Sequence, residues 1–239
     1  MLINEHTDFR EGQVLLFDKP LYWTSFDLVK KVKNLIRNTY GYKKLKVGHA
    51  GTLDPLAGGL MIICTGRYTK KINEFQDKAK EYVAGFQLGK TTPSFDLETD
   101  VDATFPADHV DEGLLEKTLS EFEGEFDQVP PLYSAKRYNG GRAYDYARKG
   151  IDIKLEPKKI VFHKLELMEF DHPYVRVRIL CSKGTYIRSF ARDLGIAVNS
   201  GAYLSDLVRT AIGEYRLEDV MSLKDFELLL GRIKENIKK

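Results

Sequence analysis

The chain has 239 residues, of which 43% are hydrophobic and 11% aromatic, and its formal net charge is +2 at pH 7. This composition is typical of a folded soluble protein with one large domain or two small ones. No run of about 20 apolar residues could cross a bilayer, and the N-terminal segment lacks the basic start and apolar stretch of a secretory signal. Two distant cysteines, Cys64 and Cys181, exclude a disulfide framework and a C-x-x-C metal pair. We therefore expect a cytoplasmic protein.

The charges are distributed unevenly along the chain. Residues 91–128 contain twelve acids and one lysine, a net charge of −11, so the rest of the chain carries +13 against the total of +2. Basic residues gather at 30–46, 67–71 and 136–149. A single cluster is most simply the solvated face of a helix, but three together favour a positive face that binds a nucleic acid.

Hydrophobic periodicity predicts the elements in chain order. The first helix begins at Thr24 or Ser25, either of which can cap it. Its predicted apolar stripe is Phe26, Val29, Val32 and Ile36. The predicted strands are 13–17, 60–64, 81–89, 161–170 and 174–184. The other predicted helices begin near Thr69, include Leu114–Phe122, and span 185–194 and 222–237. Because the elements do not alternate regularly, we expect an α+β fold with a mixed, mainly antiparallel sheet flanked by helices.

The segment 128–156 is predicted to be an insertion that protrudes from the core of one domain spanning residues 1–239. It begins with Pro-Pro and is interrupted by Gly140-Gly141. Its tyrosines and cations alternate: Tyr133, Tyr138, Tyr144 and Tyr146 with Lys136, Arg137, Arg142 and Arg148. Aromatic rings between cations suit unpaired bases and their phosphates, so these four cations are predicted to bind RNA.

The stretch GHAGTLDPLAGGL at 48–60 holds four glycines and one carboxylate, Asp54. It contains neither a P-loop nor a dinucleotide-binding fingerprint. The glycines indicate either a tight loop that holds Asp54 in place or an ordinary surface turn. Both interpretations remain open on this stretch alone.

Two further positions are candidates for chemistry. Tyr82 stands at the head of the 81–89 strand, where a packing role is the common case. Tyr186 and Arg188 lie at the start of the 185–194 helix. Arg188 is either a surface ion-pair residue or the partner that keeps a buried carboxylate ionised.

The patterns of several hydrolases are absent from the sequence. Five histidines are scattered without metal-ligand spacing, and H-E-x-x-H, the zinc deaminase pattern and G-x-S-x-G do not occur. A glycosidase with paired carboxylates remains possible by composition, although nothing singles out a second acid.

Four blocks in order resemble the TruB family of bacterial tRNA pseudouridine(55) synthases: GHAGTLDPLAGGL, EYVAGFQLG, VPPLYSAKRYNGGRAYDYARKG and CSKGTYIRSFARDLG. The resemblance runs from about Leu15 to Tyr215. It implies a mixed antiparallel sheet with a central cleft. It also implies an isomerase that flips a T-loop uridine out, detaches its base, rotates it and rejoins it through C5, without metal or organic cofactor.

The resemblance also implies roles for individual residues. Asp54 matches the catalytic aspartate, and Arg188 matches its ion-pair partner. The remaining matches form the substrate pocket: His49 in the space the flipped base vacates, Tyr82 stacked on the target base, Tyr186 nearby and Leu207 as an apolar wall. The 128–156 insertion matches a mobile loop that closes over RNA. Whether Asp54 attacks the sugar or the base, or abstracts a sugar proton, stays open.

The sequence departs from the family pattern in two places. The family usually shows Lys-Pro-x-Gly-x-Thr-Ser, whereas this chain has Tyr22 in place of the glycine, a change that bears on the local turn and not on the chemistry. About two dozen residues follow Tyr215, so we expect a short form without a separate C-terminal PUA domain, a tRNA-binding monomer that needs no protein partner or membrane.

Three rival functions remain. The first is a guide-RNA-dependent pseudouridine synthase, whose catalytic domain looks similar. The second is a helper that binds and folds tRNA without catalysis, which would not need Asp54 and Arg188 together. The third is a generic RNA-binding module.

Overall fold

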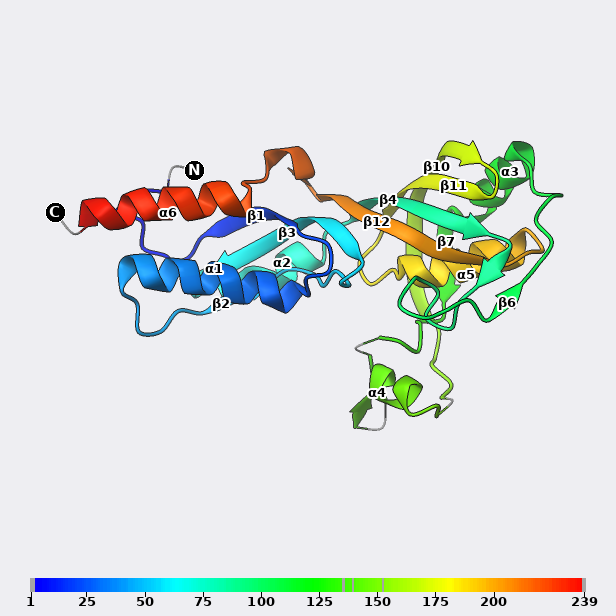
Figure 1. Cartoon of the computed structure of the whole chain (residues 1–239), viewed down its shortest axis with the longest axis horizontal. Coiled ribbons are helices and arrows are strands. Elements are labelled where there is room, and N and C mark those ends of the chain that lie inside the picture. The colour runs from blue at the N-terminus through cyan, green and yellow to red at the C-terminus, as the bar shows by residue number, and fades with distance from the viewer. Residues whose placement is uncertain (1–2, 135, 139, 152, 238–239) are drawn as a thin grey trace. The chain divides into compact units, whose positions relative to one another are not determined.

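Residues 3–134, 136–138, 140–151 and 153–237 are described by a computed structural model (Figure 1). The chain divides into a first unit, Met1–Lys78 with Val208–Lys239, and a second unit, Ala79–Leu207. Among the described residues, no helix is long and apolar enough to span a membrane.

The first unit is organised around β3 (Ala57–Thr65), all nine residues of which are buried. On one side β3 pairs antiparallel with β1 (Val14–Lys19), in a register that runs from Val14 opposite Cys64 to Lys19 opposite Gly59. Its first residues follow a short loop from β2 (Val47–His49), which is also antiparallel to β3. The 3₁₀ helix Gly66–Lys71 and α2 (Ile72–Gln76) follow β3 directly.

Two helices complete the core of the first unit. A capping box between Thr24 and Asp27 starts α1 (Ser25–Tyr40), and Gly41 ends it in the left-handed conformation with φ 67°. α6 (Leu223–Ile237) packs against α1, and Phe226 meets Phe17 of β1 edge to face. The buried apolar residues of α1 are Leu28, Val29, Val32 and Ile36.

The predicted stripe of α1 was therefore wrong at one position. Phe26 is 69% exposed. At 100° per residue it lies roughly 100° from the middle of the buried stripe, on the outer face of the helix. Leu28 occupies the core position that the prediction assigned to Phe26.

The second unit contains four antiparallel strands in the order β4-β11-β10-β7. Their bounds are Lys80–Leu88 for β4, Tyr174–Cys181 for β11, Lys158–Asp171 for β10 and Gly124–Gln128 for β7. The helices α3 (Glu112–Phe122) and α5 (Ile187–Ala197) pack against β10 and β4. Their core is aromatic, with Phe190 in ring contact with Phe86, Phe122 and Phe162.

Small elements complete the second unit. β5 (Lys90–Thr91) pairs with β6 (Ala103–Thr104). Between β7 and β10 lie β8 (Arg137–Tyr138), β9 (Gly141–Arg142) and α4 (Ala143–Arg148). Figure 1 shows α4 in an extension that projects from the rest of this unit.

The α+β class predicted from the sequence is confirmed. β1 pairs antiparallel with β3, the strands β4, β11, β10 and β7 are antiparallel to their neighbours, and helices flank them. Eight strands of the described chain were missed, most of them of two or three residues, and two of the missed strands are longer. The longer two are β7 and β12 (Ala202–Ile212), and the end of β12 pairs with β13 (Tyr215–Arg216). β12 contains Ser205, Asp206 and Arg209, which interrupt the apolar alternation that identifies a strand.

Candidate active site

The loop that carries Asp54 connects β2 to β3 and is fixed by a buried serine. Ser25, the first residue of α1, donates a hydrogen bond from Oγ to the Leu53 carbonyl (2.9 Å) and accepts one from the Leu53 N–H (2.8 Å). On the other side of Asp54, its own carbonyl accepts from the Ala57 N–H (3.1 Å). The backbone is thus held on both sides of the half-buried carboxylate, which preorganises its position.

Arg209 of β12 supports the same loop, and its position explains why residue 59 is a glycine. Its side chain is 1% exposed. Nε donates to the Leu60 carbonyl (2.8 Å), and Nη2 donates to the Gly51 carbonyl (3.2 Å). Gly59 has φ +103°, and a Cβ there would overlap the Arg209 backbone. Glycine is therefore required at this position near the start of β3, where the chain approaches the Arg209 backbone.

A second buried cation, Lys19, lies at the end of β1. Its Nζ donates to the carbonyls of Pro20 (2.9 Å) and Trp23 (2.6 Å). Burial lowers the pKa of the Lys19 ammonium, and the negative charge of Asp54 is the largest influence that raises it. Lys19 is thus electrostatically coupled to Asp54 inside the first unit.

His49 ends β2, five residues before Asp54. Burial lowers the pKa of its imidazole, and the Arg209 charge acts in the same direction. The neutral ring is therefore the favoured form at neutral pH. Among the described residues, no group of three or more His, Cys, Asp or Glu side chains could hold a metal ion.

The other predicted pocket residues belong to the second unit. Tyr82 is 8% exposed on β4, opposite Ile179 of β11. Tyr186 is the N-cap residue of α5, and the Gln128 side chain binds both its N–H (2.8 Å) and its carbonyl (3.1 Å). Leu207 lies half-buried on β12.

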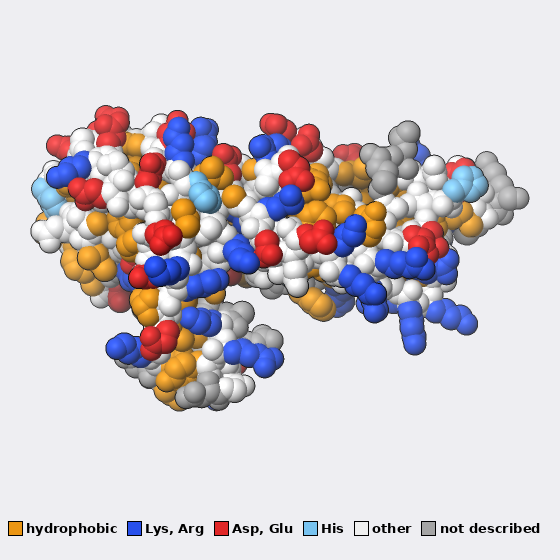
Figure 2. Space-filling view, turned by 180° about the vertical axis from the view of Figure 1, so that it is seen from behind, with side chains coloured by type: hydrophobic (Ala, Val, Ile, Leu, Met, Phe, Trp, Pro, Cys, Tyr) orange, Lys and Arg blue, Asp and Glu red, His pale blue; other side chains and the backbone are white. Residues whose placement is uncertain are grey.

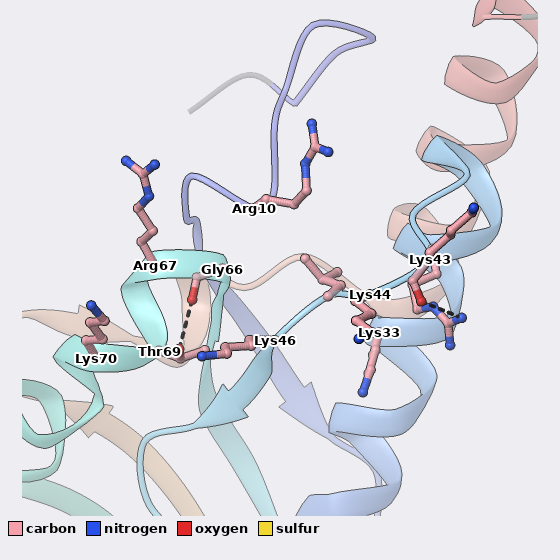
Figure 3. Close-up of a pocket in the computed structure, with 11 residues that line it drawn as sticks. Arg10, Lys33, Lys43, Lys44, Lys46, Gly66, Arg67, Thr69 and Lys70 are labelled. Carbon is pink, nitrogen blue, oxygen red and sulfur yellow. Dashed lines mark hydrogen bonds between the residues drawn. The ribbon is translucent and has the colours of Figure 1, made fainter.

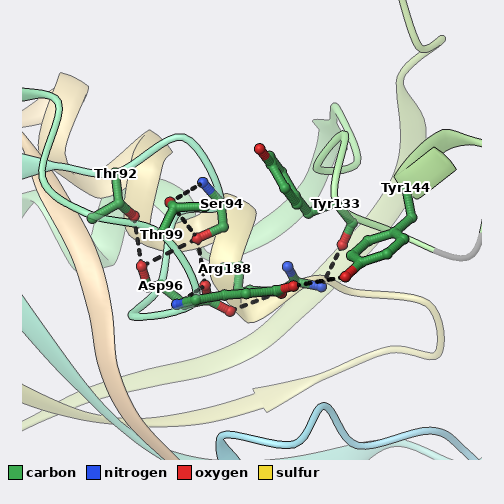
Figure 4. A network of polar contacts seen from close by, with 8 residues as sticks. Thr92, Ser94, Asp96, Thr99, Tyr133, Tyr144 and Arg188 are labelled. Atoms are coloured by element: carbon green, nitrogen blue, oxygen red, sulfur yellow. Dashed lines mark hydrogen bonds and ion pairs between the residues drawn. The ribbon is translucent and has the colours of Figure 1, made fainter. Parts of the chain in front are cut away.

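Arg188, on the first turn of α5, is buried in a polar network (Figure 4). Its Nη2 donates to the Tyr133 carbonyl (2.9 Å), and its Nε lies 3.6 Å from Asp96 Oδ2. The side chains of Arg188 and Asp96 are both 6% exposed. Of the two interpretations offered by the sequence, a surface ion pair is wrong, because this pair is buried.

Asp96 is itself held rigidly. Its Oδ1 accepts from Ser94 Oγ (2.6 Å) and from the Glu98 N–H (3.0 Å). Its carbonyl accepts from Thr92 Oγ1 (2.7 Å). With Oδ1 engaged in this way, Oδ2 is directed at Arg188, and the guanidinium orientation is set by a fixed anion.

The insertion contacts this network through Tyr133 and Tyr144. Besides the Tyr133 carbonyl, Tyr144 of α4 donates from its hydroxyl to Glu98 Oε1 (3.1 Å), a bond that raises the pKa of the Tyr144 phenol. The Arg148 guanidinium lies 5.7 Å from the Tyr144 ring centroid. Tyr133 and Tyr144 form one edge-to-face pair, and Tyr138 and Tyr146 form another.

The predicted RNA-binding cations of the insertion are placed differently from one another. Lys136 donates from Nζ to the Glu156 carbonyl (3.0 Å). Arg137 and Arg148 are exposed. The backbone of Arg142 lies in β9, but its side chain is outside the part of the chain that the structure describes.

Two of the three basic clusters come together in the first unit. A pocket of about 610 Å³ is lined by residues of α1, of the loop after it and of the turn after β3 (Figure 3). Eight cations line it: Arg10, Lys33, Arg37, Lys43, Lys44, Lys46, Arg67 and Lys70. Figure 2 shows Lys and Arg side chains gathered on this unit, at the right of the view. We call the eight cations that line the pocket the basic pocket.

Comparison with known proteins identifies the family. A family model described as TruB family pseudouridylate synthase (N terminal domain) matches residues 37–187. The chain belongs to this TruB family. It is 55% identical over 219 residues to tRNA pseudouridine synthase B of Phocaeicola vulgatus, covering 92% of this chain and 93% of the relative. It is 51% identical over 221 residues to the protein of the same name from Flavobacterium johnsoniae, covering 92% and 96%.

A solved structure agrees with this assignment. A chain in the crystal structure of a Cbf5–Nop10–Gar1 complex is 27% identical, with a TM-score of 0.71 over 95% of this chain. Our chain spans 57% of the length of that protein. The TruB resemblance and the pseudouridine synthase fold predicted from the sequence are both confirmed.

Three residues that support the site were not predicted from the sequence. Asp96 is one of twelve acids in the segment 91–128, so composition could not select it. Lys19 and Arg209 are charged residues, which sequence patterns place on the surface by default. The sequence shows that Lys19 directly precedes the turn at Pro20, but it does not indicate that Lys19 is buried.

Proposed function

We propose that this chain isomerises a uridine to pseudouridine in the T-loop of tRNA, at position 55. The observation that carries the proposal is the 55% identity to a tRNA pseudouridine synthase B across nearly the full length of both chains. The fixed loop around Asp54 supplies the carboxylate such a reaction needs. The chain is a pseudouridine synthase by family, and the proposal adds the substrate and the position.

The proposed reaction rearranges the uridine without gaining or losing atoms overall. The target nucleotide leaves its stack and enters the pocket. The bond between N1 and the sugar C1′ breaks, the uracil rotates, and C5 bonds to C1′. C5 then loses its proton and N1 gains one. Asp54 is the proposed catalytic residue for breaking the glycosidic bond.

We propose that the remaining predicted residues hold the substrate and the charge of Asp54. Arg188 pairs with Asp54, Tyr82 stacks on the uracil, and Tyr186 and Leu207 complete the pocket. His49 fills the space that the flipped base leaves. Support comes from the burial of Arg188 and its fixed orientation by Asp96, and from the neutral form of His49 favoured by burial.

We further propose that residues 1–239 act as one catalytic domain, a monomer in the cytoplasm that needs no protein partner. Substrate tRNA is bound by the insertion at 128–156 and by the basic pocket. The exposed cations Arg137 and Arg148 beside paired tyrosines support the first contact. The eight clustered cations support the second. Nothing in the comparisons favours a folding helper without catalysis.

The test is tritium release from T-arm RNA labelled at C5 of its uridines. We expect one equivalent of tritium per RNA, and none from a matched RNA in which the target uridine is replaced by cytidine. Binding without release would establish the helper function instead. Release from the cytidine-substituted RNA would show that a different uridine is the target.

RNA affinity should depend steeply on salt through the basic pocket. Each phosphate contact adds about 0.7 to 0.9 to the slope of log K against log salt. The double variant Lys44→Ala, Lys46→Ala should lower the slope by about 2 and weaken binding to any RNA sequence alike. The measurement is filter binding of T-arm RNA across a salt series. The control is Lys224→Ala, an exposed lysine on α6. If the parent chain, the double variant and Lys224→Ala all have the same slope of log K against log salt, the basic pocket has no role in RNA binding.

A further inference from the structure

An exposed apolar surface adjoins the Asp54 loop. It consists of Leu21, Tyr22 and Phe26, whose exposed fractions are 53%, 79% and 69%. We call these three residues the Tyr22 patch. Large apolar side chains that gather on a surface mark a site of interaction more often than singly exposed ones do.

Tyr22 adopts a backbone conformation that tyrosine disfavours. Its φ is +66°. It is the third residue of a turn closed by the Trp23 N–H, which donates to the Pro20 carbonyl (3.3 Å). A positive φ at this position is normally supplied by glycine or asparagine. Strain of this kind persists where the surroundings impose it, typically at functional sites. With 79% of the side chain exposed, burial does not offset the strain.

The turn is tied rigidly to the catalytic loop. The buried Lys19 ammonium holds the carbonyls on both sides of Tyr22, those of Pro20 and Trp23. The Tyr22 N–H donates to the carbonyl of Pro55 (2.7 Å), the residue after Asp54. Phe26 follows Ser25, which binds the residue before Asp54. The patch and Asp54 therefore share the same supports.

The outer face of α1 leads from this patch to the basic pocket. Phe26, Lys30, Lys33 and Arg37 are spaced by four, three and four residues, so they lie on one face of the helix. Lys30 is exposed, and Lys33 and Arg37 line the basic pocket. From Phe26 to Arg37 the helix rises by about 16 Å. The face thus joins an aromatic end to a cationic end.

We infer that the Tyr22 patch stacks on an unpaired base of the RNA substrate, with the phosphates of that strand following α1 to the basic pocket. Aromatic rings beside cations are the arrangement that binds single-stranded RNA. Continuity with the Asp54 loop at one end and the basic pocket at the other favours RNA over a second copy of this chain. The inference rests on the proposed function, because it places the strand next to the target uridine.

Tyr22→Gly separates a binding role from a structural one. Glycine relieves the positive φ, so the thermal midpoint should stay the same or rise by up to about 4 °C. Loss of the stacked ring should raise the Kd for T-arm RNA about tenfold. Tyr22→Phe keeps the ring and should bind like the parent chain. An increase in Kd that occurs together with a lower thermal midpoint would mean a structural role and would overturn the inference.

Two control variants match the two changes that Tyr22→Gly makes. Leu228→Ala removes an exposed apolar side chain of the same unit, 53% exposed on α6. Asn199→Gly relieves a positive φ of 52° without removing an aromatic ring. Both should retain the parent Kd for T-arm RNA. If either raises the Kd as much as Tyr22→Gly does, stacking at the patch is not the cause.

A direct readout is the fluorescence of 2-aminopurine placed in turn at each unpaired position of the T-arm RNA. We expect one flanking position to be quenched by the parent chain and by Tyr22→Phe, but not by Tyr22→Gly. Equal quenching by all three proteins would overturn the inference, as would a parent dimer that Tyr22→Gly converts to monomer. The proposed function has a separate test, because it fails if the parent chain releases no tritium. In that case the quenching still decides whether the Tyr22 patch binds a base.

Discussion

Asp54→Asn should abolish tritium release from T-arm RNA, with a loss on the order of 10³-fold or more in single-turnover rate. Asparagine keeps the size of the side chain and removes its charge. The loop backbone should keep its shape, because the Ala57 N–H still donates to the Asp54 carbonyl and Ser25 still holds Leu53. RNA binding should therefore be retained. The measurement is tritium release with the variant in excess over RNA, beside filter binding of the same RNA.

Asp18→Asn is the matched control for this result. Asp18 is another carboxylate of the first unit, and its Oδ1 accepts from the Gly59 N–H (2.9 Å). The asparagine oxygen can accept the same bond, so this variant should retain the parent rate within a few fold. Equal losses in the two variants would indicate a general effect of removing negative charge near Lys19. Full activity in Asp54→Asn would exclude Asp54 as the catalytic residue.

The elements that the sequence predicts well are those with one regular face. β3 is a continuous apolar run and is buried along its whole length. In α6, the apolar spacing predicts that Phe226, Leu229, Leu230 and Ile233 face the core, and all of these except the half-buried Leu229 are buried. In α1 the period was right but the phase was displaced, so Phe26 was assigned to the core and Leu28 was overlooked. One exposed aromatic residue is enough to displace the predicted buried face of a helix. Periodicity depends only on residue type and contains no information on which elements pack against the helix.

The elements that were missed depend on tertiary contacts. β12 carries Arg209, a buried cation whose hydrogen bonds go to carbonyls some 150 residues earlier in sequence. An arginine in that position argues against a buried strand until those carbonyls are known. The alternation rule fails here because the strand contributes to the support of the Asp54 loop as well as to a sheet.

The residues of the candidate site likewise divide into those that the sequence predicts and those that depend on tertiary contacts. The loop around Asp54 was found from the sequence because glycine, proline and a lone acid stand together in a specific motif. Asp96 was not found, since it lies among many acids and is distinguished only by its burial and its position against Arg188. Asp54 is thus marked by a sequence motif, whereas Asp96 is distinguished only by packing in the folded chain.

Asp96→Asn should lower both the stability of the chain and its rate of catalysis. The substitution keeps an oxygen that can accept from Ser94 and from the Glu98 N–H, but it removes the charge that faces the buried Arg188 guanidinium. Breaking one side of a buried ion pair costs about 3 kcal/mol. A guanidinium displaced by about 1 Å would lower the single-turnover rate about 10²-fold. Urea unfolding and tritium release, measured well below the thermal midpoint, would give the two values.

Glu98→Gln is the control that separates orientation of Arg188 from docking of the insertion. It weakens the contact between Tyr144 and the Glu98 carboxylate but leaves the Glu98 N–H on Asp96. It should therefore change RNA affinity more than the rate at saturation, whereas Asp96→Asn should change the rate and leave the Kd near the parent value. A parent rate in Asp96→Asn, with stability reduced as expected, would show that Arg188 keeps its working orientation without this anion. Asp96 would then be a residue of the fold alone, because its loss would not affect the reaction.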